Sequence, residues 1–234
     1  MVTILKIILN VFKKFFRKKP KSEPLEEFSE DEFEKLKFKA RIALIDDEEV
    51  RHVQRLQKEG YNIVDYPDIE NMDDFLRKRY HVVVLDIQGV GKQLAGTMEG
   101  WGILRYIKNE APHHVVIMFT GADWSVTKYK TQVELADDFI GKDLEYLDFK
   151  SKLDAGIRRA FSFRFHFEIE KRKIASQVIN STNLSQVHDI LFKYGKNKAV
   201  AMKELRKVSD NNHVLQAADN FLSISSSIVS LITG

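Results

Sequence analysis

The sequence Arg41-Ile-Ala-Leu-Ile-Asp-Asp-Glu48 decides the expected fold, because a short apolar run ends there in two adjacent aspartates. Short β-branched runs of this kind, separated by helix-like stretches, are typical of parallel strands that are buried on both faces. Three later runs have the same form: residues 81–85 end at Asp86, residues 115–119 end at Thr120, and residues 139–141 precede Lys142. Because ligands bind at the carboxyl ends of such strands, we expect these polar groups to share one edge of a sheet.

The expected edge combines carboxylates, a hydroxyl and an ammonium group, which suits a magnesium ion and a phosphoryl group. Taken alone, Asp46 and Asp47 would more simply cap the following helix, and a single Thr120 or Lys142 at a strand end would be incidental. Their joint order along the chain favours the functional interpretation.

Strands and helices are expected to alternate regularly between residues 39 and 160. The expected strands are 41–45, 61–66, 81–85, 115–119 and 138–141, and the expected helices are 48–59, 70–79, 102–109, 125–135 and 145–160. This alternation predicts an α/β fold with a doubly wound, five-stranded parallel sheet and right-handed crossovers.

The order of these motifs resembles the receiver domain of bacterial two-component response regulators, over about residues 40–160. The segments that carry the resemblance are Ile45-Asp-Asp-Glu48, Leu85-Asp86, Met98–Ile107, Phe119-Thr-Gly121 and Phe139-Ile-Gly-Lys142. The resemblance implies a flavodoxin-like receiver fold with a phosphoacceptor site at the strand ends.

The resemblance also implies a role for each matching residue. Asp86 would be the phosphoacceptor, phosphorylated from a histidine kinase or phosphotransfer protein in a Mg²⁺-dependent reaction. Asp46, Asp47, Asp86 and the backbone carbonyl of Gln88 would hold the metal, Thr120 and Lys142 would contact the phosphoryl oxygens, and Phe139 would be the switch aromatic. Such a protein catalyses its own phosphoryl uptake and is not a turnover enzyme.

Two features depart from the family pattern. Asp143 follows Lys142 where the family usually has proline, so the loop after the last strand would be built differently. Asp86 and Gly100 are separated by 14 positions, more than in the family, and the additional residues lie within 89–97, beside the phosphoacceptor. This enlarged loop would alter access to Asp86 and the lifetime of its phosphate.

Charge is strongly segregated along the 234 residues. The net charge of +3 comprises +7 from residues 1–21 and +4 from residues 161–234, which leaves −8 for residues 22–160. An acidic central region would favour a bound cation. The chain has no cysteine, which excludes disulfides and thiolate metal sites and is typical of a cytoplasmic protein.

Residues 1–19 have the pattern of a basic amphipathic helix. Its apolar face would include Phe12, Phe15 and Phe16, and its basic face Lys6, Lys13 and Lys14. One interpretation is an in-plane anchor on an anionic membrane, peripheral on the inner face; the other is a helix docked on this protein or a partner. Residues 1–38 would then be this helix and an acidic linker, which either stays solvated or forms a short helix before the first strand.

Residues 161–234 are expected to form an α-helical output or dimerisation region. Residues 147–180 fit one long helix, although the alternation of Phe161, Phe163, Phe165 and Phe167 would also suit a strand. Such a helix would mediate homodimerisation or simply pack on the rest of the chain. Three more helices are expected at 184–194, 197–208 and 213–232.

The leading hypothesis is a phosphorylation-switched signalling protein whose C-terminal helices bind a partner protein. One alternative is a DNA-binding transcription regulator that uses the third of these four helices, which carries Lys198, Lys203, Arg206 and Lys207. The other is a receiver-fold scaffold that is never phosphorylated.

Overall fold

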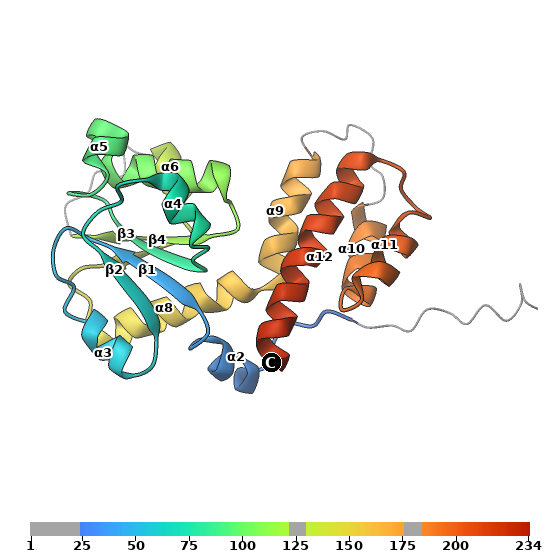
Figure 1. The fold of residues 1–234 in the computed structure, drawn as a ribbon, viewed down its shortest axis with the longest axis horizontal. Coiled ribbons are helices and arrows are strands. Elements are labelled where there is room, and N and C mark those ends of the chain that lie inside the picture. Colours follow the sequence, from blue (N-terminus) through green and yellow to red (C-terminus); the bar gives the residue numbers. More distant parts are fainter. Residues whose placement is uncertain (1–23, 122–129, 176–183) are drawn as a thin grey trace, which may run out of the picture.

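The chain folds around one parallel sheet with a helical region attached to its side (Figure 1). The computed structural model describes residues 24–121, 130–175 and 184–234. The strands follow the order β2-β1-β3-β4-β5 and all pair in parallel. Their bounds are β1 Arg41–Ile45, β2 Asn62–Tyr66, β3 Val82–Asp86, β4 Val115–Thr120 and β5 Asp138–Gly141. The predicted doubly wound, five-stranded α/β fold is confirmed.

The central strands are buried on both faces because apolar residues occupy successive positions. On one face, Ile42, Val84 and Ile117 pack with α3 (Val53–Lys58) and α8 (Tyr146–Phe161). On the other face, Ala43 and Val83 pack with α4 (Met72–Arg77) and α6 (Glu99–Glu110). Successive strand side chains point to opposite faces, so an unbroken apolar run supplies both layers. Figure 1 shows α3 and α8 on one side of the sheet and α4 and α6 on the other.

The strand order reverses between β1 and β3, which are adjacent and pair from Ile42↔Val82 to Ile45↔Leu85. In doubly wound sheets the crevice outside the strand ends at this switch point is the usual ligand site. The residues after Ile45 and Leu85 are Asp46 and Asp86, so the fold brings two carboxylates to that crevice.

One expected helix begins later than predicted, and another is described only in part. The helix expected from residue 48 begins at Val53, since Asp46 Oδ1 accepts the N–H of Glu48 at 2.9 Å and holds the chain in a turn. The helix expected over 125–135 is present as α7 (Lys130–Val133), with residues 122–129 outside the described part of the chain.

The single long helix expected over residues 147–180 is wrong, and so is the strand alternative. The chain breaks at Ser162, which is extended at φ −69° and ψ 123°, and α9 (Phe163–Ala175) follows. Ser162 Oγ accepts the N–H of Phe165 at 3.3 Å, which is a capping contact at the start of α9. Glu27 Oε1 accepts from the Arg164 N–H at 3.0 Å and from Ser162 Oγ at 3.1 Å, so a distant carboxylate stabilises the break.

The C-terminal region consists of α9, α10 (Leu184–Tyr194), α11 (Lys198–Leu205) and α12 (Asn212–Thr233). Helix α12 packs along α9 and against α11, and α10 packs against α11 (Figure 1). Phe167, Leu191 and Phe221 are buried between these helices and belong to the same apolar cluster as the α8 face of the sheet. The helical region therefore shares a continuous core with the sheet.

The segment before β1 also belongs to the folded structure. It forms the short helix α2 (Glu30–Leu36), whose N-terminus has a Ser29–Glu32 capping box. Leu25 is buried and its N–H donates to the Phe192 carbonyl at 2.7 Å, which ties the segment to α10. The short-helix interpretation of the linker is thus confirmed. Among the described helices, none has both the length and the apolar character needed to cross a bilayer.

Histidines lie where the sheet meets the helical region, at the edge opposite Asp86. His81 Nδ1 accepts the Arg41 N–H at 2.9 Å, and burial lowers the pKa of His81 to about 4. His113 contacts His166 between their Nδ1 atoms at 3.0 Å and Glu170 Oε1 at 2.6 Å. Burial also lowers the pKa of His166 to about 4. Both low-pKa imidazoles are therefore held neutral by the fold.

We expect stability to fall with acidification through these two groups. The unfolded chain takes up a proton on each histidine near pH 6.5, whereas the folded chain does so only near pH 4, so folding free energy is lost between these values. The loss through His81 should be about 1–2 kcal/mol between pH 7 and pH 5. Urea unfolding at the two pH values measures it.

The matched variant is His81→Asn, which keeps a side-chain acceptor for Arg41 but does not titrate. Its stability should change less between pH 7 and pH 5 than that of the wild type. An identical pH dependence in both proteins would contradict the assignment.

Candidate functional site

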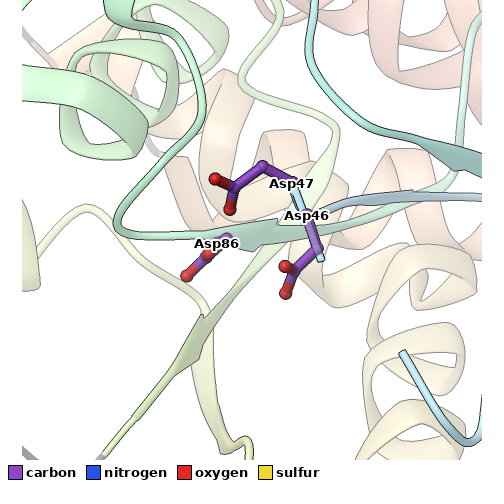
Figure 2. Close-up of side chains that lie close together, drawn as sticks. All are labelled: Asp46, Asp47 and Asp86. Atoms are coloured by element: carbon purple, nitrogen blue, oxygen red, sulfur yellow. The ribbon is translucent and has the colours of Figure 1, made fainter. Parts of the chain in front are cut away.

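Three aspartates meet at the carboxyl ends of β1 and β3 (Figure 2). One oxygen from each of Asp46, Asp47 and Asp86 lies within 4.8 Å of the other two. Asp46 and Asp86 are each only 3% exposed, whereas Asp47 is open to solvent. The site thus has two carboxylates in the protein interior and one at its entrance.

Lys142 supplies the positive charge that these buried carboxylates need. Its Nζ lies 2.9 Å from Asp46 Oδ2 and 2.8 Å from Asp86 Oδ2. The residue follows β5, and its side chain reaches across β4 at 5.5 Å from the centre of the Phe119 ring. A backbone hydrogen bond from the Lys142 N–H to the Thr120 carbonyl, at 2.7 Å, fixes the backbone from which this side chain extends.

Backbone donors orient the other oxygen of each buried carboxylate. Asp86 Oδ1 accepts the N–H groups of Ile87 at 2.7 Å and Gln88 at 3.3 Å. Asp46 Oδ1 accepts the Glu48 N–H, while its buried Oδ2 faces only Lys142 among the described residues. The carboxylates are therefore held in place before any ligand arrives.

Among the residues that the structure describes, the charges at the site do not balance. Burial raises the pKa of Asp86, and the neighbouring Asp46 charge acts in the same direction, against the hydrogen bond from Lys142. Burial would lower the pKa of Lys142, but its bonds to Asp86 and Asp46 outweigh burial and raise it. One ammonium group beside three carboxylates leaves a net negative charge that a further cation would compensate.

The donor set fits a magnesium ion. Carboxylate oxygens are the hard ligands that Mg²⁺ prefers, and the ion keeps several waters, which the exposed side of Asp47 would admit. Within residues 24–121, 130–175 and 184–234, the buried Asp46 Oδ2 has only the Lys142 ammonium group beside it, and a second cation would be a suitable further partner.

Three other predicted site residues lie in or shortly after strands β3, β4 and β5. Thr120 is 8% exposed, and its Oγ1 donates to the Gly121 carbonyl at 2.8 Å. Phe139 is half-buried, with its ring centroid 6.3 Å from that of Trp101 on α6. Gln88 is exposed and joined to Asp86 through its N–H. The predicted Phe12, Phe15, Phe16, Lys6, Lys13 and Lys14 lie outside the described residues.

The enlarged loop after Asp86 contains anchors that the sequence analysis did not identify. It forms α5 (Lys92–Ala95) and the 3₁₀ turn η1 (Gly96–Met98). Glu99 Oε2 accepts the Gly89 N–H and Asp68 Oδ1 accepts the Gly91 N–H, each at 2.7 Å. A glutamate one residue before Gly100 was the available signal for the first contact.

The loop after Lys142 is held by a side chain from another part of the chain. Arg51 Nη2 donates to the carbonyls of Asp143 at 3.3 Å and Leu144 at 2.8 Å. A guanidinium group from the β1–α3 connection thus holds the turn that contains Asp143.

Comparison with known proteins found similarity to solved structures of receiver domains, each below 25% sequence identity. No protein-family model and no curated protein matches the sequence. The receiver domain of NtrX from Brucella abortus is 24% identical, with a TM-score of 0.41, over 50% of this chain and 97% of that one. A response regulator receiver domain protein from Clostridium thermocellum is 23% identical, with a TM-score of 0.42, over 51% and 95%.

A CheY-like response regulator receiver domain protein from Methanospirillum hungatei JF-1 is 23% identical, with a TM-score of 0.41, over 52% of this chain and 97% of that one. The strand order 2-1-3-4-5 independently gives the flavodoxin-like arrangement. The predicted flavodoxin-like fold of the central sheet is confirmed by this order. The similarity to these solved structures covers about half of this chain.

We expect Lys142→Met to destabilise the folded protein in the absence of Mg²⁺. The change leaves Asp46 and Asp86 as neighbouring buried charges, and should cost about 1–3 kcal/mol of unfolding free energy, less than for a fully buried pair because Lys142 is partly open to solvent. Urea unfolding in EDTA measures this loss.

Adding Asp86→Asn to the Lys142→Met protein should recover at least half of the loss, because only one buried charge then remains. A double variant no more stable than Lys142→Met would contradict the assigned electrostatic role. Wild type and Asp86→Asn alone complete the double-mutant cycle.

Proposed function

We propose that this chain is a response-regulator-like signalling protein that accepts a phosphoryl group on Asp86 in a Mg²⁺-dependent reaction. The observation that carries the proposal is the setting of Asp86. Its carboxylate lies at the end of the central strand β3, in contact with the ammonium group of Lys142 and close to two further aspartates. On this sheet Asp86 would thus have a phosphoryl-binding cation and metal ligands beside it.

The proposed acceptor reaction joins an Asp86 carboxylate oxygen to phosphorus as the phosphorus–nitrogen bond of a phosphohistidine breaks, and the donor imidazole leaves. Asp46, Asp47, Asp86 and the Gln88 carbonyl would hold Mg²⁺, which supplies charge neutralisation to the phosphoryl oxygens when bound. The donor would be a histidine kinase or a phosphotransfer protein. The chain promotes its own phosphorylation and does not turn over substrate.

Lys142 and Thr120 would exchange their present partners for the phosphoryl group. Lys142 contacts two carboxylates and can redirect Nζ to a phosphoryl oxygen once Asp86 is an acyl phosphate, in which the negative charge lies on the phosphoryl oxygens. The Thr120 hydroxyl donates to the Gly121 carbonyl and would rotate to donate to the phosphoryl group instead. Phe139, half-buried beside Trp101, would follow Thr120 inward as the switch aromatic.

The output would pass from β5 through α8 to the helical region. Lys142 lies four residues before Tyr146, where α8 begins, and α8 leads through Ser162 into α9. We divide the chain accordingly into residues 1–38, a receiver domain over 39–160 and an output region over 161–234. The helices of the last region would bind a partner protein or a second copy of this chain.

DNA binding through α11 has less support in the structure. Lys198 Nζ pairs with Asp219 and donates to Ser223, each at 2.8 Å, and Lys207 pairs with Glu204 at 2.5 Å. Two of the four predicted cations are thus engaged within the protein, which reduces the charge available for phosphate contacts. The amphipathic residues 1–19 stay a prediction, and vesicle binding with and without them tests the membrane anchor.

We expect acetyl phosphate with Mg²⁺ to label the wild type and to leave Asp86→Asn unlabelled, because the amide cannot form an acyl phosphate. Intact-protein mass spectrometry at neutral pH reads the added phosphoryl group. Omitting Mg²⁺ is expected to abolish labelling of the wild type.

Asp65→Asn is a matched control, since Asp65 lies at the neighbouring strand β2 outside the aspartate cluster. It should label like the wild type. Equal labelling of Asp86→Asn would refute the phosphoacceptor assignment, and a folded wild type that takes up no phosphoryl group would favour the scaffold alternative.

A further inference from the structure

Glu99 has a backbone conformation that L-residues rarely adopt. Its φ is 47° and its ψ is −133°, and Arg79 is the one other non-glycine residue with positive φ in the described ranges. Strain of this kind costs about 1–3 kcal/mol and persists where surrounding contacts hold it, often at functional sites. Glu99 lies at the start of α6, where the enlarged loop returns to the aspartate cluster.

The backbone next to Glu99 contacts the backbone of residues 86–87, at the proposed phosphoacceptor. A Cβ built on the next residue, Gly100, would lie 1.9 Å from the Asp86 carbonyl oxygen, so the two backbones are in direct contact. The Gly100 N–H donates to the Ile87 carbonyl at 3.2 Å. The Glu99 backbone therefore cannot move without disturbing the residues that follow Asp86.

The Glu99 side chain returns to the same segment and holds one peptide group. Its Oε2 accepts the Gly89 N–H at 2.7 Å. Gly89 in turn lies against the metal-binding cluster, because a Cβ built on it would be 2.1 Å from Asp47 Oδ1. One face of this short loop thus contacts Glu99, and another contacts the exposed aspartate of the cluster.

The Gly89 N–H shares a planar peptide unit with the Gln88 carbonyl. The described residues contain no cis peptide bond, so the N–H and C=O of this unit point in opposite directions. Fixing the N–H on Glu99 therefore fixes the direction of the Gln88 carbonyl oxygen. That carbonyl is the one backbone ligand that the proposed function assigns to Mg²⁺.

We propose that Glu99 is a positioning residue for the metal site, which acts by orienting the Gln88–Gly89 peptide. The inference rests on the proposed function, since it concerns the same Mg²⁺. Partners that orient metal ligands typically contribute about 10- to 100-fold to metal affinity. The role depends on a hydrogen-bond acceptor at this position rather than on its negative charge.

The test is calorimetric titration of the full chain with MgCl₂, without any phosphoryl donor. Glu99→Ala removes the acceptor and should weaken Mg²⁺ binding about 10-fold. Glu99→Gln keeps an amide oxygen at the same reach and should remain within about threefold of the wild type, as expected for a neutral bond replacing a charged one.

Asp68→Ala is the matched control for loop loosening and for loss of a nearby charge. Asp68 accepts the Gly91 N–H in the same loop at the same distance of 2.7 Å, whereas Glu99 accepts the N–H of the Gln88–Gly89 peptide. Its Mg²⁺ affinity should stay near that of the wild type. Thermal unfolding of each variant establishes that it is folded.

Glu99→Ala binding Mg²⁺ like the wild type would overturn the positioning role. Equal weakening in Glu99→Gln and Glu99→Ala would also overturn it, because charge alone would then explain the effect, and so would equal weakening in Asp68→Ala. A folded wild type that binds no Mg²⁺ would instead overturn the metal site of the proposed function itself.

Discussion

The site depends on one ammonium group that compensates two buried carboxylates. Asp46 and Asp86 are almost fully removed from water, and each has an oxygen within 3 Å of Lys142 Nζ. Burying an unpaired carboxylate is costly, so the ends of β1, β3 and β5 are constrained to meet through this contact. The same ammonium group would move to a phosphoryl oxygen after phosphorylation. Lys142 would therefore stabilise the unphosphorylated site and also take part in the proposed switch.

The helical region is joined to the sheet through packing and polar contacts far from the aspartates. Glu27 stabilises the break between α8 and α9, and Lys39 Nζ donates to the Leu231 carbonyl of α12 at 2.6 Å. His113, which precedes β4, reaches Glu170 on α9. Burial would raise the pKa of Glu170, but its bonds from His113 and Lys173 outweigh burial and lower it, so it remains a charged partner at this junction. A conformational change that passes from β5 to α8 would therefore act on a helical region that is bonded to the sheet at several points.

Prediction from sequence was accurate where local pattern decides structure. Strand β1 and helix α10 have the predicted bounds, because apolar runs and helical periodicity are properties of neighbouring residues. Prediction was wrong where a distant group decides. The break at Ser162 depends partly on Glu27, which lies 135 residues earlier in the chain and which no local pattern around 147–180 discloses.

The sequence by itself determined the strands, their order of appearance and the polar residue at each strand end, since these follow from residue type and spacing. That was enough to name Asp46, Asp47, Asp86, Thr120 and Lys142 as one constellation. Only the tertiary structure decided that Lys142 lies between Asp46 and Asp86, that Glu99 holds the Gly89 N–H, and that α2 and the C-terminal helices share the core of the sheet. Most of these contacts join residues that are far apart in the chain, and the contact of Glu99 also depends on its strained backbone. Their geometry arises only when the elements pack.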